Sequence, residues 1–202
     1  IRASVDWGVL QLSEFVHLTG SFAFEIGPTQ VAKLTSNDLL FGDTKQLEFL
    51  TVGAEDVNLF VGINGPYWKG DTNNNRQNDA NEIDPDAVGI LAQNLDVGFA
   101  MMRPTVVFDP ARYYALKATL EKAAFVGVKE IKAELNNVAV EVNLVDPRTS
   151  LGNPLDLPVV DFTSLQGGKL GVKTGKKIQD PNDPNKMIDS TVDLTMNSPL
   201  IA

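Results

Sequence analysis

The feature that most constrains the fold is an alternation of apolar and polar residues with a period of two. Odd positions from Ile1 to Val9 are apolar, and the positions between them are polar or glycine. The apolar phase then changes to even positions, at Leu10, Leu12, Val16, Leu18, Phe22, Phe24 and Ile26. A shift of one residue turns every later side chain of a strand to the other face. The sequence therefore predicts a bulge or sharp bend before Gly27-Pro28 ends this segment.

Further strands are predicted wherever the same period recurs, at 46–63, 88–102, 113–127, 131–145, 157–163, 168–173 and 190–196. Turn-forming residues separate them, including Asn64-Gly65-Pro66 and Asp146-Pro147. The stretch 113–145 predicts a long hairpin that turns near 127–130. Its residues 115–124 are rich in Ala, Leu, Glu and Lys and also fit a helix. The fold class expected is all-β, in one module spanning residues 1–202.

Three segments share a pattern in which a polar pair interrupts a strand. They are 54–60, 92–99 and 135–140, and each places Asn or Asp between small and large apolar residues. Long strands bent at one level of a sheet would give this pattern, and so would successive rungs of a β-solenoid. The spacings of 38 and 43 residues are irregular for a repeat. The preferred fold is therefore a sandwich or curled sheet of long, bent antiparallel strands, with the solenoid as the alternative.

Composition excludes several classes of function. The net charge of −9 argues against nucleic-acid binding, which needs a basic surface, and it disfavours an anionic membrane. No apolar run approaches the roughly 18 residues of a membrane-spanning helix, so membrane insertion is not expected. Cysteine is absent and His17 is the single histidine, which argues against zinc. Acidity without disulfides suits an extracellular domain that a hard divalent cation stabilises.

The segment from Asp71 to Glu82 has the spacing of a twelve-residue EF-hand-type calcium loop. Oxygen-bearing side chains occupy positions 1, 3, 5, 9 and 12, which are Asp71, Asn73, Asn75, Asp79 and Glu82. Gln77 at position 7 would offer its backbone carbonyl. Ca²⁺ takes six to eight oxygen ligands, so a coiled loop must present one at nearly every second residue. The sequence predicts a calcium site here, with Glu82 closing it through both carboxylate oxygens.

The loop departs from the EF-hand pattern in two ways. Arg76 stands where glycine normally permits the sharp turn, and neither flank has helical periodicity. The interpretation is a calcium loop set between strands, with a dissociation constant of roughly 10⁻⁴–10⁻³ M. The alternative is an Asn-rich surface turn that binds no metal. A second cluster, at 180–189, lacks Glu at its twelfth position and is interpreted as a solvated acidic loop.

No catalytic motif is evident, and the chain is not expected to be an enzyme. It contains no Gly-x-Ser-x-Gly, phosphate-binding glycine loop or His-Glu-x-x-His. Trp7, Tyr67 and Trp68 could stack on a sugar. Trp7, however, is expected on the core face of its strand, and 66–68 is expected to pack the base of the loop. The second hypothesis for the function is a carbohydrate- or ligand-binding adhesin domain.

A family resemblance rests on three parts of the chain. They are 50–68 followed by the Asp/Asn loop, Ser21-Phe22-Ala23-Phe24 before it, and 113–118 after it. Together they resemble a repeat unit of very large bacterial surface or secreted proteins, grouped with calcium-dependent adhesins and matrix proteins. The resemblance covers roughly residues 10–145. It implies an extracellular or cell-surface location, a structural role and calcium binding at the loop positions named above.

The ends of the chain indicate assembly. Alternation begins at Ile1, and the last residues, 199–202, remain apolar. An exposed apolar strand is an aggregation hazard unless something pairs with it. The hypothesis is that a terminal segment adds to the sheet of another copy or an adjacent repeat. The alternative is that both ends pair within their own domain.

Overall fold

The structure is a computed structural model that describes residues 1–38, 41–75, 80–149 and 157–201. Its strands are β1 (Arg2–Leu12), β2 (Val16–Ile26), β3 (Gln30–Asp38), β4 (Gly42–Ile63), β5 (Val88–Pro104), β6 (Tyr113–Val126), β7 (Ala133–Val145), β8 (Val160–Asp161), β9 (Leu170–Asp180), β10 (Asp183–Leu194) and β11 (Leu200–Ile201). Short 3₁₀ helices lie at Ala80–Glu82, Phe162–Ser164 and Gln166–Gly168. None of the described helices has the length and apolarity that crossing a membrane requires.

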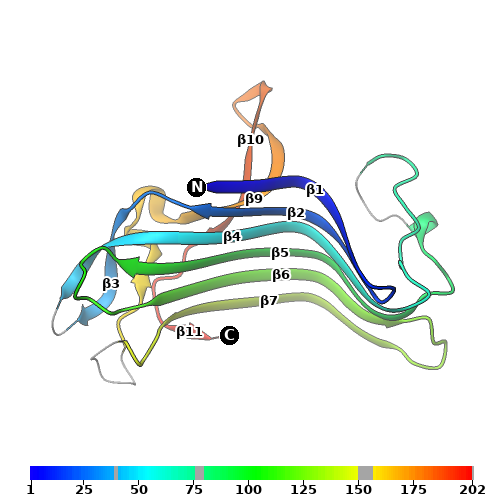
Figure 1. The fold of residues 1–202 in the computed structure, drawn as a ribbon, viewed down its shortest axis with the longest axis horizontal. Helices are drawn as coiled ribbons and strands as arrows, with labels where there is room; N and C mark the ends of the chain where they lie inside the picture. Colours follow the sequence, from blue (N-terminus) through cyan, green and yellow to red (C-terminus); the bar gives the residue numbers. More distant parts are fainter. Residues whose placement is uncertain (39–40, 76–79, 150–156, 202) are drawn as a thin grey trace.

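Six long strands form the body of the molecule (Figure 1). The sheet order is β1-β2-β4-β5-β6-β7-β11, with β3 pairing β4 and β8, while β9 and β10 form a separate hairpin. All strand pairs in the described part of the chain are antiparallel. This confirms the all-β prediction and rules out the solenoid, whose rungs would stack in parallel. Residues 115–124 lie within β6, so the helical alternative is wrong.

The first predicted segment contains the expected bulge but also a turn. Pairing between β1 and β2 shifts register between Val5 and Gly8, shortly before the apolar phase of the sequence changes from odd to even positions at Leu10. The chain then reverses at 13–15, with Ser13 in the left-handed region at φ 61°. The bulge turns Trp7 away from the face that Ala3 and Val5 occupy, and its side chain is 41% exposed. The prediction that Trp7 lies in the core is therefore wrong. β1 pairs with β2 of its own chain and β11 with β7.

Other segments also differ from the prediction. Of the predicted strand 157–163, only Val160–Asp161 is a strand, and a 3₁₀ helix follows at Phe162–Ser164. β3 was missed because only two of its side chains, Ala32 and Leu34, are buried apolar ones. The acidic cluster at 180–189 is not a loop but the tip of the β9–β10 hairpin and the first part of β10, with Asp180 paired to Asp183. Arg2 binds Asp189 through two hydrogen bonds of 2.7 Å and holds the pKa of that carboxyl well below its usual range. The neutralised carboxylate fastens β10 to the edge strand β1.

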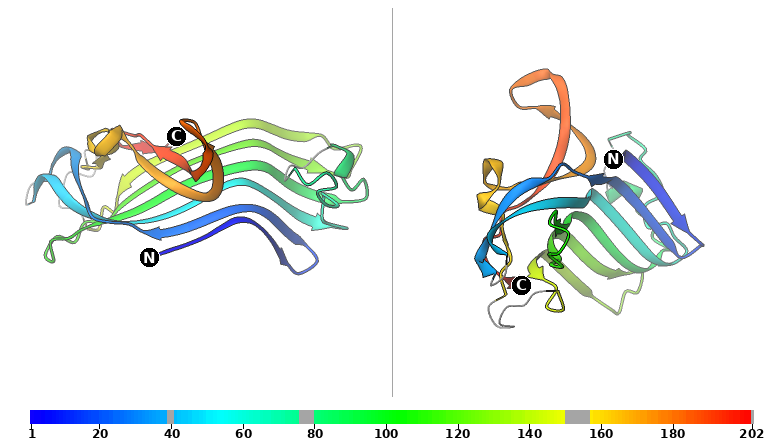
Figure 2. Two further views of the ribbon diagram at one scale, coloured as in Figure 1. Left: turned by 90° about the horizontal axis from the view of Figure 1, so that it is seen from above. Right: turned by 60° about the vertical axis from the view of Figure 1, so that its left-hand side comes forward.

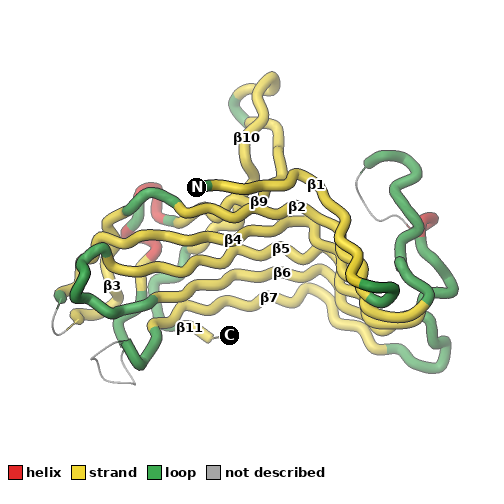
Figure 3. The backbone as a smooth tube through the Cα atoms, viewed as in Figure 1, coloured by secondary structure: helices red, strands yellow, loops and turns green. Residues whose placement is uncertain are grey.

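The polar pairs predicted to mark a bend do so. Asp56, Asn94 and Asn137 adopt left-handed φ values of 53°, 51° and 54° at one level of β4, β5 and β7, where the strands bend together (Figure 3). The amide of Asn94 donates to Asn58 Oδ1 at 3.1 Å, and that of Asp56 donates to Asp96 Oδ1 at 3.0 Å. Polar side chains thus satisfy amides that the bulges take out of the ladder. This need explains the Asn and Asp residues in mid-strand.

We expect Asn94→Val to lower the free energy of unfolding by about 1–3 kcal/mol, because a β-branched residue is strained at positive φ. Asn94→Gly should change it by less than about 1 kcal/mol, since glycine adopts this conformation freely. Urea unfolding of both variants measures the difference. Equal midpoints for the two variants would show that the bend does not depend on the conformation of this residue.

One face of the sheet is covered on both sides of the bend (Figure 2). We call the half of the sheet beneath β9 and β10 the core half. The two strands cross it so closely that a Cβ atom at Gly53 would collide with the carbonyl of Lys173, and a Cβ atom at Gly98 would collide with Val192. Over the other half, the loop half, the segment between β4 and β5 packs on Phe60. Asn75 of that segment and Lys176 of β9 line one cleft, so both covers lie on the same side.

Candidate functional site

The predicted calcium loop lies between β4 and β5, at the end of the loop half (Figure 1). Its two ends are joined like the base of a hairpin. Trp68 forms a β-bridge with Ile83, the amide of Lys69 donates to the carbonyl of Glu82 at 2.8 Å, and Asp84 donates to Tyr67 at 2.7 Å. The first and twelfth positions of the loop are therefore held near each other by backbone hydrogen bonds.

Aromatic rings anchor this base to the sheet. Tyr67 stacks on Phe60 with ring centroids 6.0 Å apart, and Trp68 meets Tyr67 edge-on at 5.2 Å. Trp68 is only 8% exposed and belongs to the small core cluster of the loop half. The expectation that 66–68 packs the base of the loop is confirmed for Tyr67 and Trp68. The loop thus starts from a fixed platform.

Two of the predicted ligands come together, and a third lies beside the start of the loop. The amide of Asn75 donates to Asp71 Oδ1 at 2.9 Å and to Asn73 Oδ1 at 3.0 Å, so the oxygens of positions 1 and 3 converge on one nitrogen. Glu82 is 2% exposed, and its Oε1 accepts from the amide and the hydroxyl of Thr72 at 2.6 and 2.7 Å. These contacts bring position 12 beside the start of the loop. Oxygen donors of this kind fit Ca²⁺.

The remaining predicted ligands are placed less completely. Gln77 and Asp79, with Arg76, lie outside the described residues. Asn75 lines a cleft of about 270 Å³ together with Trp7, Asp56 and Lys176. Within the described residues, no three His, Cys, Asp or Glu side chains are grouped as metal ligands would be. In the described part of the loop, the groups with oxygens suited to a cation are the carboxylates of Asp71 and Glu82 and the side-chain amides of Asn73 and Asn75.

A buried charged cluster lies at the far end of the core half, and sequence reasoning did not find it. Lys45 donates to Asp38 at 2.9 Å and also binds Asp109, and the side chains of all three are at most 9% exposed. The ring of Phe41 lies 4.9 Å from the ammonium nitrogen. The nearby Tyr113 hydroxyl is buried, and this burial raises its pKa. Because its side chains are shielded from solvent, we interpret the cluster as a structural junction between β3, β4 and the segment after β5.

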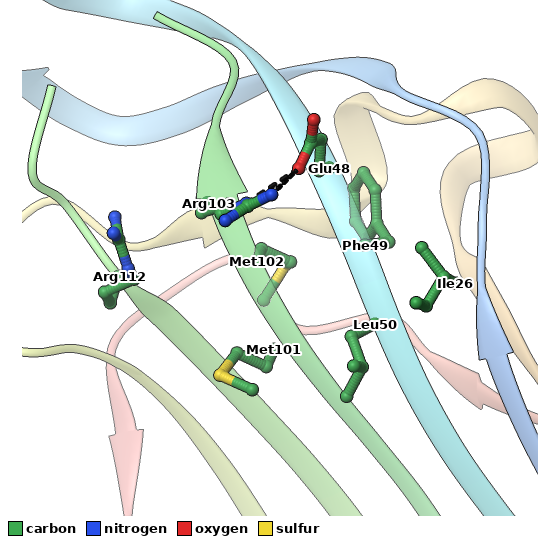
Figure 4. A pocket seen from close by; sticks show the side chains of 8 residues that line it. All are labelled: Ile26, Glu48, Phe49, Leu50, Met101, Met102, Arg103 and Arg112. Atoms are coloured by element: carbon green, nitrogen blue, oxygen red, sulfur yellow. Dashed lines mark hydrogen bonds and ion pairs between the residues drawn. The ribbon is translucent and has the colours of Figure 1, made fainter. Parts of the chain in front are cut away.

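A hollow of about 330 Å³ opens near this end, on the uncovered face (Figure 4). Ile26, Leu50 and Met101 form its apolar floor, and Glu48 and Arg103 form an ion pair of 2.6 Å at its rim. Because the charged groups at the rim bind each other, the hollow is an apolar depression rather than a site with an acid and a base directed into it. Its apolar floor is part of the uncovered side of the sheet.

Comparison with known proteins gives no relative: no protein-family model, curated protein or solved structure matches this chain.

Proposed function

We propose that this chain is a structural calcium-binding module of a bacterial cell-surface or extracellular assembly. The observation that supports the proposal most directly is the burial of Glu82 at the twelfth position, beside Thr72 and the start of the loop. A carboxylate is costly to bury unless charge or hydrogen bonds compensate it. The two hydrogen bonds from Thr72 hold this carboxylate at the start of the loop, where a cation among Asp71, Asn73 and Glu82 would add charge compensation. The resemblance to repeats of large bacterial surface proteins supports the location.

A structural role suits the site better than signalling. The loop is fixed at its base by backbone hydrogen bonds and by the rings of Tyr67 and Trp68, so it is joined directly to a core cluster. Calcium sensors open pairs of helices around their loops, and here the loop joins two strands. Ion binding would therefore order the loop and add stability to the loop half of the sheet.

The sheet also offers edges for assembly with other copies or adjacent repeats. In the six-strand order, β1 and β7 are the outer long strands and run in opposite directions, because every pair is antiparallel. β11 pairs with β7 only at Val142 and Asn143, and a copy displaced along the sheet would place the rest of its β7 antiparallel to β1. Strand addition between sheets in which β1 stays paired with β2 is one form of the assembly proposed for the chain ends.

Glu82→Gln tests the calcium site. The change keeps the size of the side chain but removes its charge and the expected bidentate carboxylate. We expect calorimetry to show at least about a tenfold loss of calcium affinity, because charged ligands dominate binding of a hard cation. Asp183→Asn, in the hairpin tip between β9 and β10, is the control and should bind calcium like the parent chain.

Unchanged calcium binding by Glu82→Gln would mean that the loop uses another ligand set, and no binding by the parent chain would refute the calcium site altogether.

The second candidate function, carbohydrate binding, has one supporting observation. Trp7 is 41% exposed and lines the same cleft as Asn75, whereas Trp68 is buried. Quenching of fluorescence by sugars, lost in Trp7→Ala, would identify this candidate.

A further inference from the structure

The face of the sheet opposite the two covers is apolar from edge to edge. Residues paired across an antiparallel sheet share a face, so the strand register gives complete rows of six side chains. One row in the core half runs Ala3, Phe24, Val52, Phe99, Leu116 and Val142. A second, which starts at Val5 and ends at Val140, is also wholly apolar. Such rows are expected inside a protein.

The loop half continues the same surface. One row there runs Leu12, Val16, Val61, Ile90, Phe125 and Ala133, and another runs from Leu10 to Leu135. The alternate rows face the covers, as the burial of Phe60 and Leu91 beneath Trp68 shows. Residues of both covers line the cleft beside Asn75, so the two covers lie on one side of the sheet. The apolar rows of both halves therefore lie together on the other side, with the bulges of the bend between them. We call this surface the apolar face.

The apolar face is exposed to a degree that is unusual for a single molecule. Val52 is 40% exposed, Ile90 59% and Leu135 63%. The accessible surface of the chain is 11628 Å², whereas a compact monomer of this length is expected to expose about 9,300 Å². The excess is roughly 2,300 Å². Contiguous apolar patches on soluble monomers rarely exceed a few hundred Å², and larger ones mark interaction sites.

Its dimensions match those of a stable interface. Six strands about 4.8 Å apart, with about eleven residues each at 3.3 Å, cover roughly 1,000 Å². A standard interface buries about 800 Å² on each partner. Burying one apolar face against another would therefore account for much of the excess surface.

We propose that the apolar face is covered by a second copy of this chain, with apolar face against apolar face. The four rows carry no charge of either sign, so two copies present identical surfaces without burying an unpaired charge. Elsewhere, a net charge of −9 makes two copies repel. Two sheets packed in this way would lie about 10 Å apart, with interdigitated side chains. An anionic membrane is a poorer occupant, because the chain is strongly acidic.

This contact does not depend on calcium, because the metal loop lies on the opposite, covered side of the sheet. It also differs from edge-to-edge strand addition, which would use β1 and β7. Face pairing gives a closed pair, whereas edge addition extends a row of copies. The two modes, and the calcium proposal, can therefore fail separately.

The test is the molecular mass of the chain in chelator, measured by sedimentation between micromolar and hundreds of micromolar concentration. We expect the parent chain to form dimers. The dimer dissociation constant of Ile90→Glu should be at least about a hundredfold higher, because each dimer would bury two unpaired carboxylates. Met187→Glu is the matched control: Met187 is 58% exposed, compared with 59% for Ile90, but lies on β10 on the other side of the sheet. This control should remain dimeric.

Circular dichroism and melting verify that Ile90→Glu remains folded, and Val52→Glu provides an independent variant in the core half. A parent chain that is monomeric throughout the concentration range would overturn the proposal. An assembly that Ile90→Glu and Val52→Glu both leave intact would also overturn it and would assign the contact to another surface, such as the β1 edge. Loss of assembly in Met187→Glu alone would do the same.

Discussion

Calcium at 10 mM is expected to raise the melting temperature of this protein by about 5–11 °C. If the dissociation constant is near 10⁻⁴ M, this concentration is ~100 times larger, and binding to the native state alone adds ~2.7 kcal/mol to the free energy of unfolding. For a chain of this size, each kcal/mol corresponds to about 2–4 °C. The stabilisation arises because the unfolded chain does not hold Asp71, Asn73 and Glu82 together. Thermal melts in calcium and in chelator measure it.

Magnesium at the same concentration should give a much smaller shift, because it requires a compact octahedral shell and retains its water ligands. Glu82→Gln should melt at nearly the same temperature in calcium as in chelator. Coincident melting curves of the parent chain in the two buffers would refute calcium stabilisation. A rise that persists in Glu82→Gln would instead indicate that calcium binds elsewhere.

Lys45→Met is expected to lower the free energy of unfolding by about 3–5 kcal/mol, because removing one partner leaves buried charge without compensation. Lys45 is the ammonium group between Asp38 and Asp109, whose side chains are 9% and 2% exposed. Methionine fills similar space, so the loss would be electrostatic rather than a cavity effect. Urea unfolding at neutral pH, where both carboxylates are charged in the unfolded chain, measures the change.

Lys69→Met is the matched control. Lys69 also pairs with an aspartate, Asp84, at 3.4 Å, but its side chain is 57% exposed. Exposed pairs of this kind contribute about 0–1 kcal/mol, so the control should unfold almost like the parent chain. Equal losses in the two variants would show that burial does not determine the strength of the Lys45 cluster.

The local features of this fold could be predicted from local sequence. Alternation identified most of the long strands, and the phase change between Val9 and Leu10 follows closely on a real bulge, between Val5 and Gly8. The Asn and Asp residues at 56, 94 and 137 indicated a bend at one level, because their short polar side chains tolerate positive φ and satisfy amides freed by bulges. The same local reasoning placed Tyr67 and Trp68 under the metal loop, whose calcium site remains a prediction.

Contacts between distant segments were not predictable in this way. The turn at Ser13 carried no glycine or proline signal, and the tip of the β9–β10 hairpin formed from a polar stretch in which Arg2 and Lys177 both bind Asp189. The buried cluster joins Lys45 to Asp109 across 64 residues, and no local pattern encodes such a pairing.

Sequence by itself determined that the chain is a sheet of long bent strands, with oxygen-bearing side chains at a regular spacing between 71 and 82, because these features depend on the period and on residue type. Tertiary structure alone decided which face is covered. Alternation identifies two sets of side chains in every strand but does not say which set meets β9, β10 and the loop. The register placed Phe60, Leu91 and Ala124 beneath the cover, and it left Val61, Ile90 and Phe125 on the apolar face.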